Sequence, residues 1–182
     1  MLRYLKNIFQ LILSPAKGWE DISADMTDVD ELLRRGYYVL LAVASLSELV
    51  RPLYERNLSW VVAVESALAM AGSYFVALFI GRQILETYLK PLVDGDISTT
   101  RINIFAIYTL GMLLLIEIID NVLPTDLTLV KFLPLFVALI IYKATLYMAV
   151  KPDHELRFLC ISVAALIVVP IGLFAILQMI IG

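Results

Sequence analysis

The sequence predicts an all-α polytopic membrane protein with five transmembrane helices and short amphipathic helices at its cytoplasmic N-terminus. The chain of 182 residues is 61% hydrophobic and 17% charged, and its mean hydropathy is +0.88. A soluble domain is about 45–50% apolar and about 25% charged. The apolar residues gather in runs close to the roughly 20 residues that cross a bilayer as a helix. Because these runs lack the alternation of barrel strands, helices are predicted.

The five predicted spans cover approximately residues 36–53, 60–80, 102–123, 132–150 and 156–181. They form one transmembrane domain over 36–182, preceded by an amphipathic segment over 1–35. Turn-forming residues follow each of the first four spans: Pro52, Asp94-Gly95-Asp96, Pro124 and Pro152. Pro170 lies inside the fifth span, where it predicts a kink.

The distribution of Lys and Arg predicts the orientation of the chain, because cytoplasmic loops hold the excess of positive charge. With a cytoplasmic N-terminus, the opposite face has only Arg51, Arg56 and Lys131, and most other Lys and Arg residues lie on the cytoplasmic side. The C-terminus is then extracytoplasmic. The expected location is a cytoplasmic membrane of bacterial type.

The N-terminal segment predicts two short helices before the first span. Residues 2–13 place Arg3, Lys6 and Gln10 on one side of a helix and apolar residues elsewhere. This helix is expected either to lie among the cytoplasmic headgroups or to pack across the inner face of the bundle. Ser14-Pro15 begins the second helix, which offers Trp19 as an interfacial anchor. Thr27 is the predicted cap of the helix that follows.

This order of features resembles the Yip family, named for membrane proteins that interact with Ypt/Rab GTPases. The similarity is carried by Leu13-Ser14-Pro15-Ala16-Lys17-Gly18-Trp19-Glu20-Asp21-Ile22, followed by five spans with an outside C-terminus. Pro15, Trp19 and Ile22 look like the pattern that opens many short prokaryotic members. The resemblance implies the architecture and a role in binding partners, with Pro15, Trp19 and Ile22 as the candidate cytoplasmic contact. It implies no set of catalytic residues, and a Rab partner does not follow from it.

Charged residues inside the predicted spans are the candidate polar site, because each costs about 2.5–3.5 kcal/mol at a helix centre and is rarely kept without a partner. Glu48, Glu65 and Glu117 are expected at similar depth, roughly 7–9 Å below the outer interface at about 1.5 Å per residue. Arg51 and Asp120 lie one turn nearer that interface. These residues predict either an acidic pocket that binds a cation or a proton, or structural pairs such as Glu48 with Arg51.

Lys143 is expected near the middle of the bilayer, at about twelve residues from Lys131. It predicts either a counter-ion for Glu65 or Glu117, or a side chain that extends to the cytoplasmic interface. The glutamates are also weak candidates for a metal site, and no cofactor is predicted. His154 is expected to be a solvated loop residue, and Cys160 a buried small hydrophobe in an apolar run.

Partners other than the lipid bilayer are predicted only in outline. Ala63, Ala67 and Ala71 form a stripe of small residues, which indicates close helix packing or a homo-oligomer face. The net charge of −3 argues against nucleic-acid binding. The sequence has no Gly-rich phosphate loop and no set of nucleophile and base, so no enzyme activity is predicted.

The expected function is a non-enzymatic membrane scaffold or partner-binding module. Its contact surfaces would be the N-terminal segment and the loop over residues 81–101. The alternative is a small cation- or proton-coupled transporter or channel that uses the acidic pocket. An internal inverted repeat, which many transporters show, is not detected in the sequence.

Overall fold

The computed structural model describes all residues except 26–27, 56, 96, 124–129 and 182, and it confirms the all-helical fold class. The helices are α1 (Leu2–Leu13), α2 (Pro15–Ala24), α3 (Val29–Leu32), α4 (Tyr38–Ser47), α5 (Trp60–Leu89), α6 (Thr99–Val122), α7 (Leu133–Lys143), α8 (Glu155–Val163) and α9 (Val169–Ile181). A π-helical turn at Leu33–Tyr37 joins α3 to α4, and a second at Ala164–Val168 joins α8 to α9. Short 3₁₀ turns lie at Glu48–Leu53, Lys90–Leu92, Val130–Phe132 and Pro152–His154.

Within the described residues, three helical stretches are long and apolar enough to cross a membrane. They are Trp60–Leu92, Thr99–Val122 and Pro152–Ile181, and they correspond to the second, third and fifth predicted spans. The first predicted span contains α4 and the 3₁₀ turn that follows it. In the fifth, the π-helical turn ends immediately before α9, near the kink predicted at Pro170.

The fourth predicted span differs from the structure, because the helix ends before the apolar sequence does. The prediction extends to residue 150, whereas α7 ends at Lys143 and is 11 residues long, about 16 Å. Tight turns follow, and Ala149 adopts a positive φ of 51°. The amide of Asp94 donates to the carbonyl of Ala149 over 2.8 Å and that of Lys151 donates to Leu92 over 3.0 Å. This end of the chain is therefore tied to the connection between α5 and α6.

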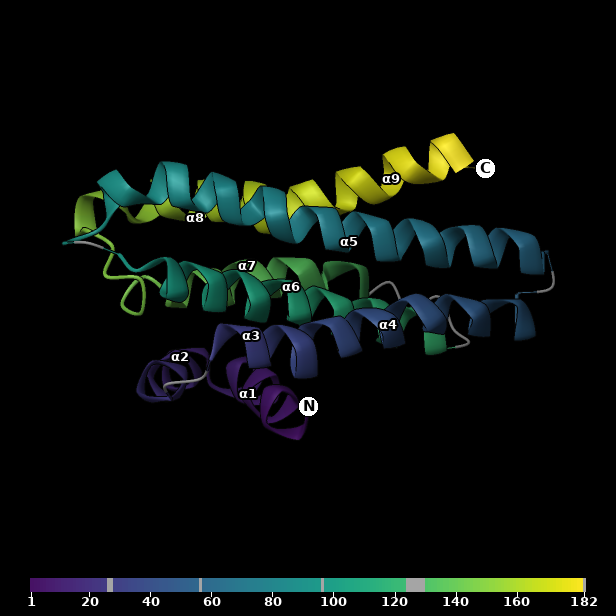
Figure 1. The fold of residues 1–182 in the computed structure, drawn as a ribbon, viewed down its shortest axis with the longest axis horizontal. Helices are drawn as coiled ribbons and strands as arrows, with labels where there is room; N and C mark the ends of the chain where they lie inside the picture. Colours follow the sequence, from purple (N-terminus) through teal and green to yellow (C-terminus); the bar gives the residue numbers. More distant parts are fainter. Residues whose placement is uncertain (26–27, 56, 96, 124–129, 182) are drawn as a thin grey trace.

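The helices form an elongated bundle with α6 at its centre (Figure 1). Every residue from Ile102 to Leu114 is buried, which accounts for more than half of α6. The helices α5 and α9 pack against each other along one side. Large apolar side chains remain exposed on these two helices, for example Leu68, Phe79 and Met179. Exposed apolar surface of this extent is suited to contact with lipid.

The N-terminal helices α1 and α2 lie together against one side of the bundle, below α3 in Figure 1. Pro15 is in the first turn of α2, as predicted. The predicted cap Thr27 lies outside the described residues. At the start of α3, the carboxylate of Asp28 accepts a hydrogen bond from the amide of Asp30 over 3.3 Å.

Candidate functional site

The helices α1 and α2 form a hairpin that the rest of the chain holds in place. The face of α1 that carries Tyr4, Ile8 and Leu11 is buried, as are Trp19 and Ile22 of α2. Polar contacts link the hairpin on its outer side: the amide of Gln10 donates to the carboxylate of Asp21, and Arg3 pairs with Asp25. Of the two predicted placements of α1, packing against the bundle is therefore the one observed. Its opposite face still exposes Leu2, Phe9 and Leu13.

Tyr4 anchors α1 to the middle of α6. Its hydroxyl donates to the carbonyl of Ile107 over 2.9 Å, and its ring centroid is 5.2 Å from that of Tyr108. Two glycines provide the space. A Cβ atom at Gly111 would be 1.9 Å from the Tyr4 hydroxyl, and one at Gly36 would be 2.8 Å from the ring. The ring of Tyr4 therefore fits a slot that these glycines leave between the start of the first predicted span and α6.

Trp19 anchors α2 to the end of α7. Its indole nitrogen donates to the carbonyl of Ile140 over 3.0 Å. In a continuing helix this carbonyl would accept from the amide of Ala144, but α7 ends there and that amide instead donates to the carbonyl of Ile141 over 3.0 Å. The last four carbonyls of a helix need partners from outside the helix. Trp19 supplies one of them, and its ring stacks on Tyr147 at 5.1 Å.

The burial of Trp19 and Ile22 changes the role expected for the candidate cytoplasmic contact. Trp19 is 1% exposed and Ile22 is 4% exposed, while Pro15 is partly buried. Both side chains pack into the interior of the chain, so they offer almost no surface to a protein partner in this conformation. The exposed residues of α2 are charged or small, and they include Lys17, Glu20 and Ala24.

A polar cluster lies at the opposite end of the bundle, where the 3₁₀ turn after α4 meets α6. The Arg51 guanidinium lies 3.2 Å from the Glu48 carboxylate and 3.1 Å from that of Glu55. Glu48 is 2% exposed, whereas the Arg51 side chain is 32% exposed, so only the carboxylate side of this ion pair is removed from solvent. The Asn121 amide donates to Ser47 over 3.0 Å, and the Tyr54 hydroxyl donates to the carbonyl of Asn121.

Glu117 lies beside this cluster but has a different hydrogen-bond partner. The hydroxyl of Tyr74 donates to the Glu117 carboxylate over 3.2 Å. Glu48, Arg51 and Asp120 all lie within electrostatic range of Glu117. Asp120 itself is exposed. The structure thus brings four of the six candidate residues, Glu48, Arg51, Glu117 and Asp120, into one region.

Glu65 and Lys143 do not join this polar cluster. Glu65 is partly buried on α5, and it has no partner among the hydrogen bonds and ion pairs of the described residues. Lys143 is exposed at the end of α7, with its amine 5.7 Å from the ring centroid of Tyr142. It forms no ion pair with Glu65 or Glu117 among the described residues, so the predicted role as their counter-ion is not observed. No group of three His, Cys, Asp or Glu residues suited to a metal ion occurs in the described part of the chain.

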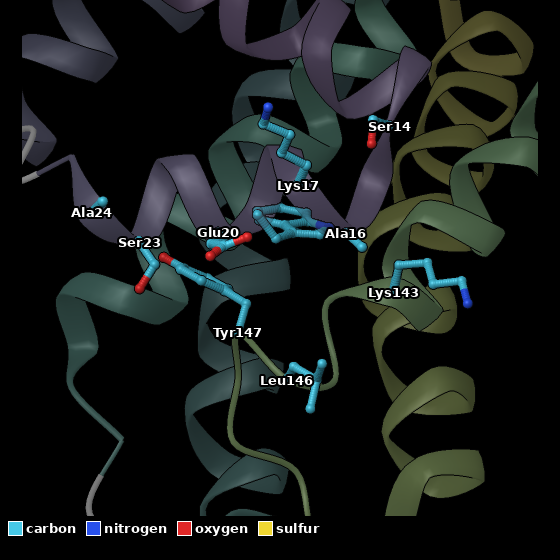
Figure 2. Close-up of a pocket in the computed structure, with 10 residues that line it drawn as sticks. Ser14, Ala16, Lys17, Glu20, Ser23, Ala24, Lys143, Leu146 and Tyr147 are labelled. Atoms are coloured by element: carbon cyan, nitrogen blue, oxygen red, sulfur yellow. The ribbon is translucent and has the colours of Figure 1, made fainter.

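Lys143 also lines a pocket of about 870 Å³ beside the hairpin (Figure 2). The pocket lies between α2 and the turns that follow α7. Its lining residues are Ser14, Ala16, Lys17, Trp19, Glu20, Ser23, Ala24, Lys143, Leu146 and Tyr147. No pattern in the sequence indicates this pocket, because an apolar run does not reveal that the helix stops at Lys143.

Other predicted positions have simpler surroundings. His154 is partly buried in the 3₁₀ turn before α8. Cys160 is exposed on α8, so the prediction that it is buried is wrong. Ala63 is fully buried inside the chain, so it cannot contribute to a homo-oligomer face, and Ala67 and Ala71 are partly buried. Tyr74 and Asn121 were missed as site residues. Each of them is a polar side chain within an apolar helix, and Asn121 is also close to Glu117 in the sequence.

Comparison of the chain with protein-family models, with curated proteins and with solved structures finds no match. The geometry therefore carries the functional argument alone. It offers two polar regions, one at each end of the bundle.

Proposed function

We propose that this chain is a Yip-like integral membrane protein that works as a non-enzymatic scaffold, with its partner-binding surface at the cytoplasmic end of the bundle. The observation that carries the proposal is the anchoring of the hairpin. Tyr4 and Trp19 bond to backbone carbonyls more than 100 positions away in the sequence. A segment fixed in this way can present its outer face to a partner in one orientation.

The proposal includes five spans with the N-terminus in the cytoplasm and the C-terminus outside. Three spans are α5, α6 and the segment from α8 to α9. Support for the other two comes from the arrangement in Figure 1, where α4 and α7 lie beside them along the long axis. The helix α7 is too short to cross alone, so the turns after it complete the crossing beside the hairpin. The excess of Lys and Arg in the N-terminal segment and in the α5–α6 connection supports the orientation.

The proposed contact surface combines the hairpin with the connection between α5 and α6. Lys17 and Glu20 are exposed on α2, and Lys90 and Asp94 are exposed in the connection. The two parts meet at the turns after α7. There, the Arg101 guanidinium lies 5.7 Å from the Tyr147 ring centroid, next to Trp19. A mixed charged surface of this kind favours a protein partner with complementary charges.

The test replaces exposed charges and leaves both anchors intact, since deletion of the hairpin would remove buried core residues. Glu20→Lys and Lys90→Glu each reverse one charge on the surface, and Asp120→Asn at the opposite end is the matched control. After cross-linking in membranes, we expect specific proteins to be recovered with the parent and the control but lost with the two reversals. The same recovery from all four proteins would contradict the proposal.

A second candidate function is cation or proton movement through the outer polar cluster. It is favoured by the burial of Glu48 and by the bond of Glu117 to an uncharged hydroxyl. It is weakened because neither Glu65 nor Lys143 takes part in an ion pair among the described residues. The scaffold proposal predicts no ion flux in reconstituted vesicles. Flux that falls when Glu117 is changed to Gln would favour the transporter instead.

A further inference from the structure

We propose that the pocket between α2 and the turns after α7 binds the headgroup of an anionic phospholipid from the adjacent leaflet. The pocket has a volume of about 870 Å³ and mixed polar and apolar walls. Trp19 and Tyr147, which stack on each other, form its aromatic side. The proposal depends on the membrane placement of the hairpin given above and adds a ligand that the scaffold function does not require.

The depth of the pocket matches the boundary between headgroups and acyl chains. Trp19 packs against Phe105 at 5.5 Å, and Tyr147 lies next to Arg101. Phe105 is about 9 Å along α6 from its first residue, Thr99, at about 1.5 Å per residue. Trp and Tyr gather at this level in membrane proteins, because one end of each ring is apolar and the other is polar.

The charges around the opening suit a phosphate group. Lys17 and Lys143 stand at two separate edges of the pocket (Figure 2), and Ser14 and Ser23 add hydroxyl groups. Glu20 is the single carboxylate in the lining. The ion pairs found among the described residues include neither lysine. The Lys143 amine, which lies 5.7 Å from the ring centroid of Tyr142, would have to turn toward the pocket to reach a ligand. Basic pockets on the cytoplasmic side of membrane proteins bind anionic headgroups.

An exposed apolar side chain at the same opening favours a lipid over a free anion. Leu146 lines the pocket and is 90% exposed. Leu13, directly before the lining residue Ser14, is 84% exposed. A soluble phosphate compound gains nothing from these side chains. The acyl chains of a phospholipid would cover both of them.

The position of Trp19 in the pocket wall provides a direct measurement. The chain has two tryptophans, so Trp60→Phe leaves Trp19 as the only one. This protein is placed in phosphatidylcholine nanodiscs that contain a small fraction of brominated phosphatidylglycerol or, separately, of brominated phosphatidylcholine. We expect stronger quenching of Trp19 fluorescence by the anionic lipid. Each lysine near an anionic lipid contributes about fivefold to binding.

The variants assign this preference to the pocket. The double variant Lys17→Gln/Lys143→Gln should reduce the preference for the anionic lipid by roughly 30-fold. The control double variant Lys90→Gln/Arg157→Gln removes equal charge outside the pocket and should retain that preference. Glu20→Gln should increase the preference for the anionic lipid. The emission spectrum of Trp19 in plain phosphatidylcholine checks that each variant keeps its fold.

Three results would overturn the lipid site. The first is equal quenching of Trp19 by the two brominated lipids. The second is a loss of the preference for the anionic lipid in the control double variant that equals the loss in the Lys17/Lys143 double variant. Loss of the preference in millimolar inorganic phosphate would show a site for soluble anions. These outcomes leave the scaffold proposal standing, because it is tested by partner recovery in variants at Glu20 and Lys90.

Discussion

Replacement of Gly111 by Ala tests whether Tyr4 holds the hairpin on α6. The added Cβ would lie 1.9 Å from the Tyr4 hydroxyl and 2.9 Å from the ring carbon that bears it. Tyr4 would have to move, and its 2.9 Å hydrogen bond to Ile107 would be lost. The proper control is Gly172→Ala in α9, because a Cβ there has no neighbour within 4 Å.

The expected cost follows from three contributions. Overpacking of a filled site costs about 1–3 kcal/mol, and loss of the hydrogen bond costs about 1 kcal/mol. The higher helix propensity of Ala offsets up to about 1 kcal/mol. Gly111→Ala should therefore destabilise the fold by about 1–3 kcal/mol, whereas Gly172→Ala should be neutral or slightly stabilising.

A double-mutant cycle with Tyr4→Phe isolates the contact. Tyr4→Phe removes the oxygen that the new Cβ would meet, so Gly111→Ala should cost about 1–2 kcal/mol less in that background. Thermal unfolding in one detergent measures the stabilities, at about 2–4 °C per kcal/mol for a chain of this size. Trypsin cleavage at Lys17 reports release of the hairpin. The reasoning is refuted if Gly111→Ala behaves like Gly172→Ala, or if its cost is unchanged by Tyr4→Phe.

Two further stability predictions use the same measurement. Trp19→Phe should destabilise the protein by about 1–3 kcal/mol, because a buried carbonyl at the end of α7 loses its donor. The control Trp60→Phe, at a site that is 57% exposed, should change stability by less than about 0.5 kcal/mol. Arg51→Gln should cost about 3 kcal/mol, because it leaves the Glu48 side chain, which is 3% exposed, without its partner. Glu55→Gln removes a partner that is 41% exposed and should cost less than about 1 kcal/mol. Equal costs within either pair would contradict the assigned roles.

Much of the helical organisation could be predicted from the sequence, because long apolar runs and the residues that end them are local signals. The length of the apolar runs and their lack of alternation predict the helical class, and Pro15 correctly marks the start of α2. The pairing of Glu48 with Arg51 was also available, since residues three apart share one face of a helical turn.

The parts that could not be predicted depend on contacts between distant segments. The end of α7 at Lys143 is invisible in the sequence, because the residues after it are still largely apolar. Glu65 was expected beside Glu117 at equal depth, but depth does not determine which way a helix is rotated. Trp19 was interpreted as a surface residue because its partner, the Ile140 carbonyl, is 121 positions away.

The separation of the two polar regions bears on the choice between scaffold and transporter. Along α6, Phe105 beside the hairpin and Glu117 beside the outer cluster are about 18 Å apart at about 1.5 Å per residue. The buried stretch between them is mostly apolar, and its polar members are Tyr108, which accepts from Asn7, and Thr109. In the described residues, α6 therefore offers no continuous chain of polar groups from one end to the other. A conducting route would have to use polar groups of other helices or form between copies of the chain, and the flux assay on reconstituted protein tests both arrangements.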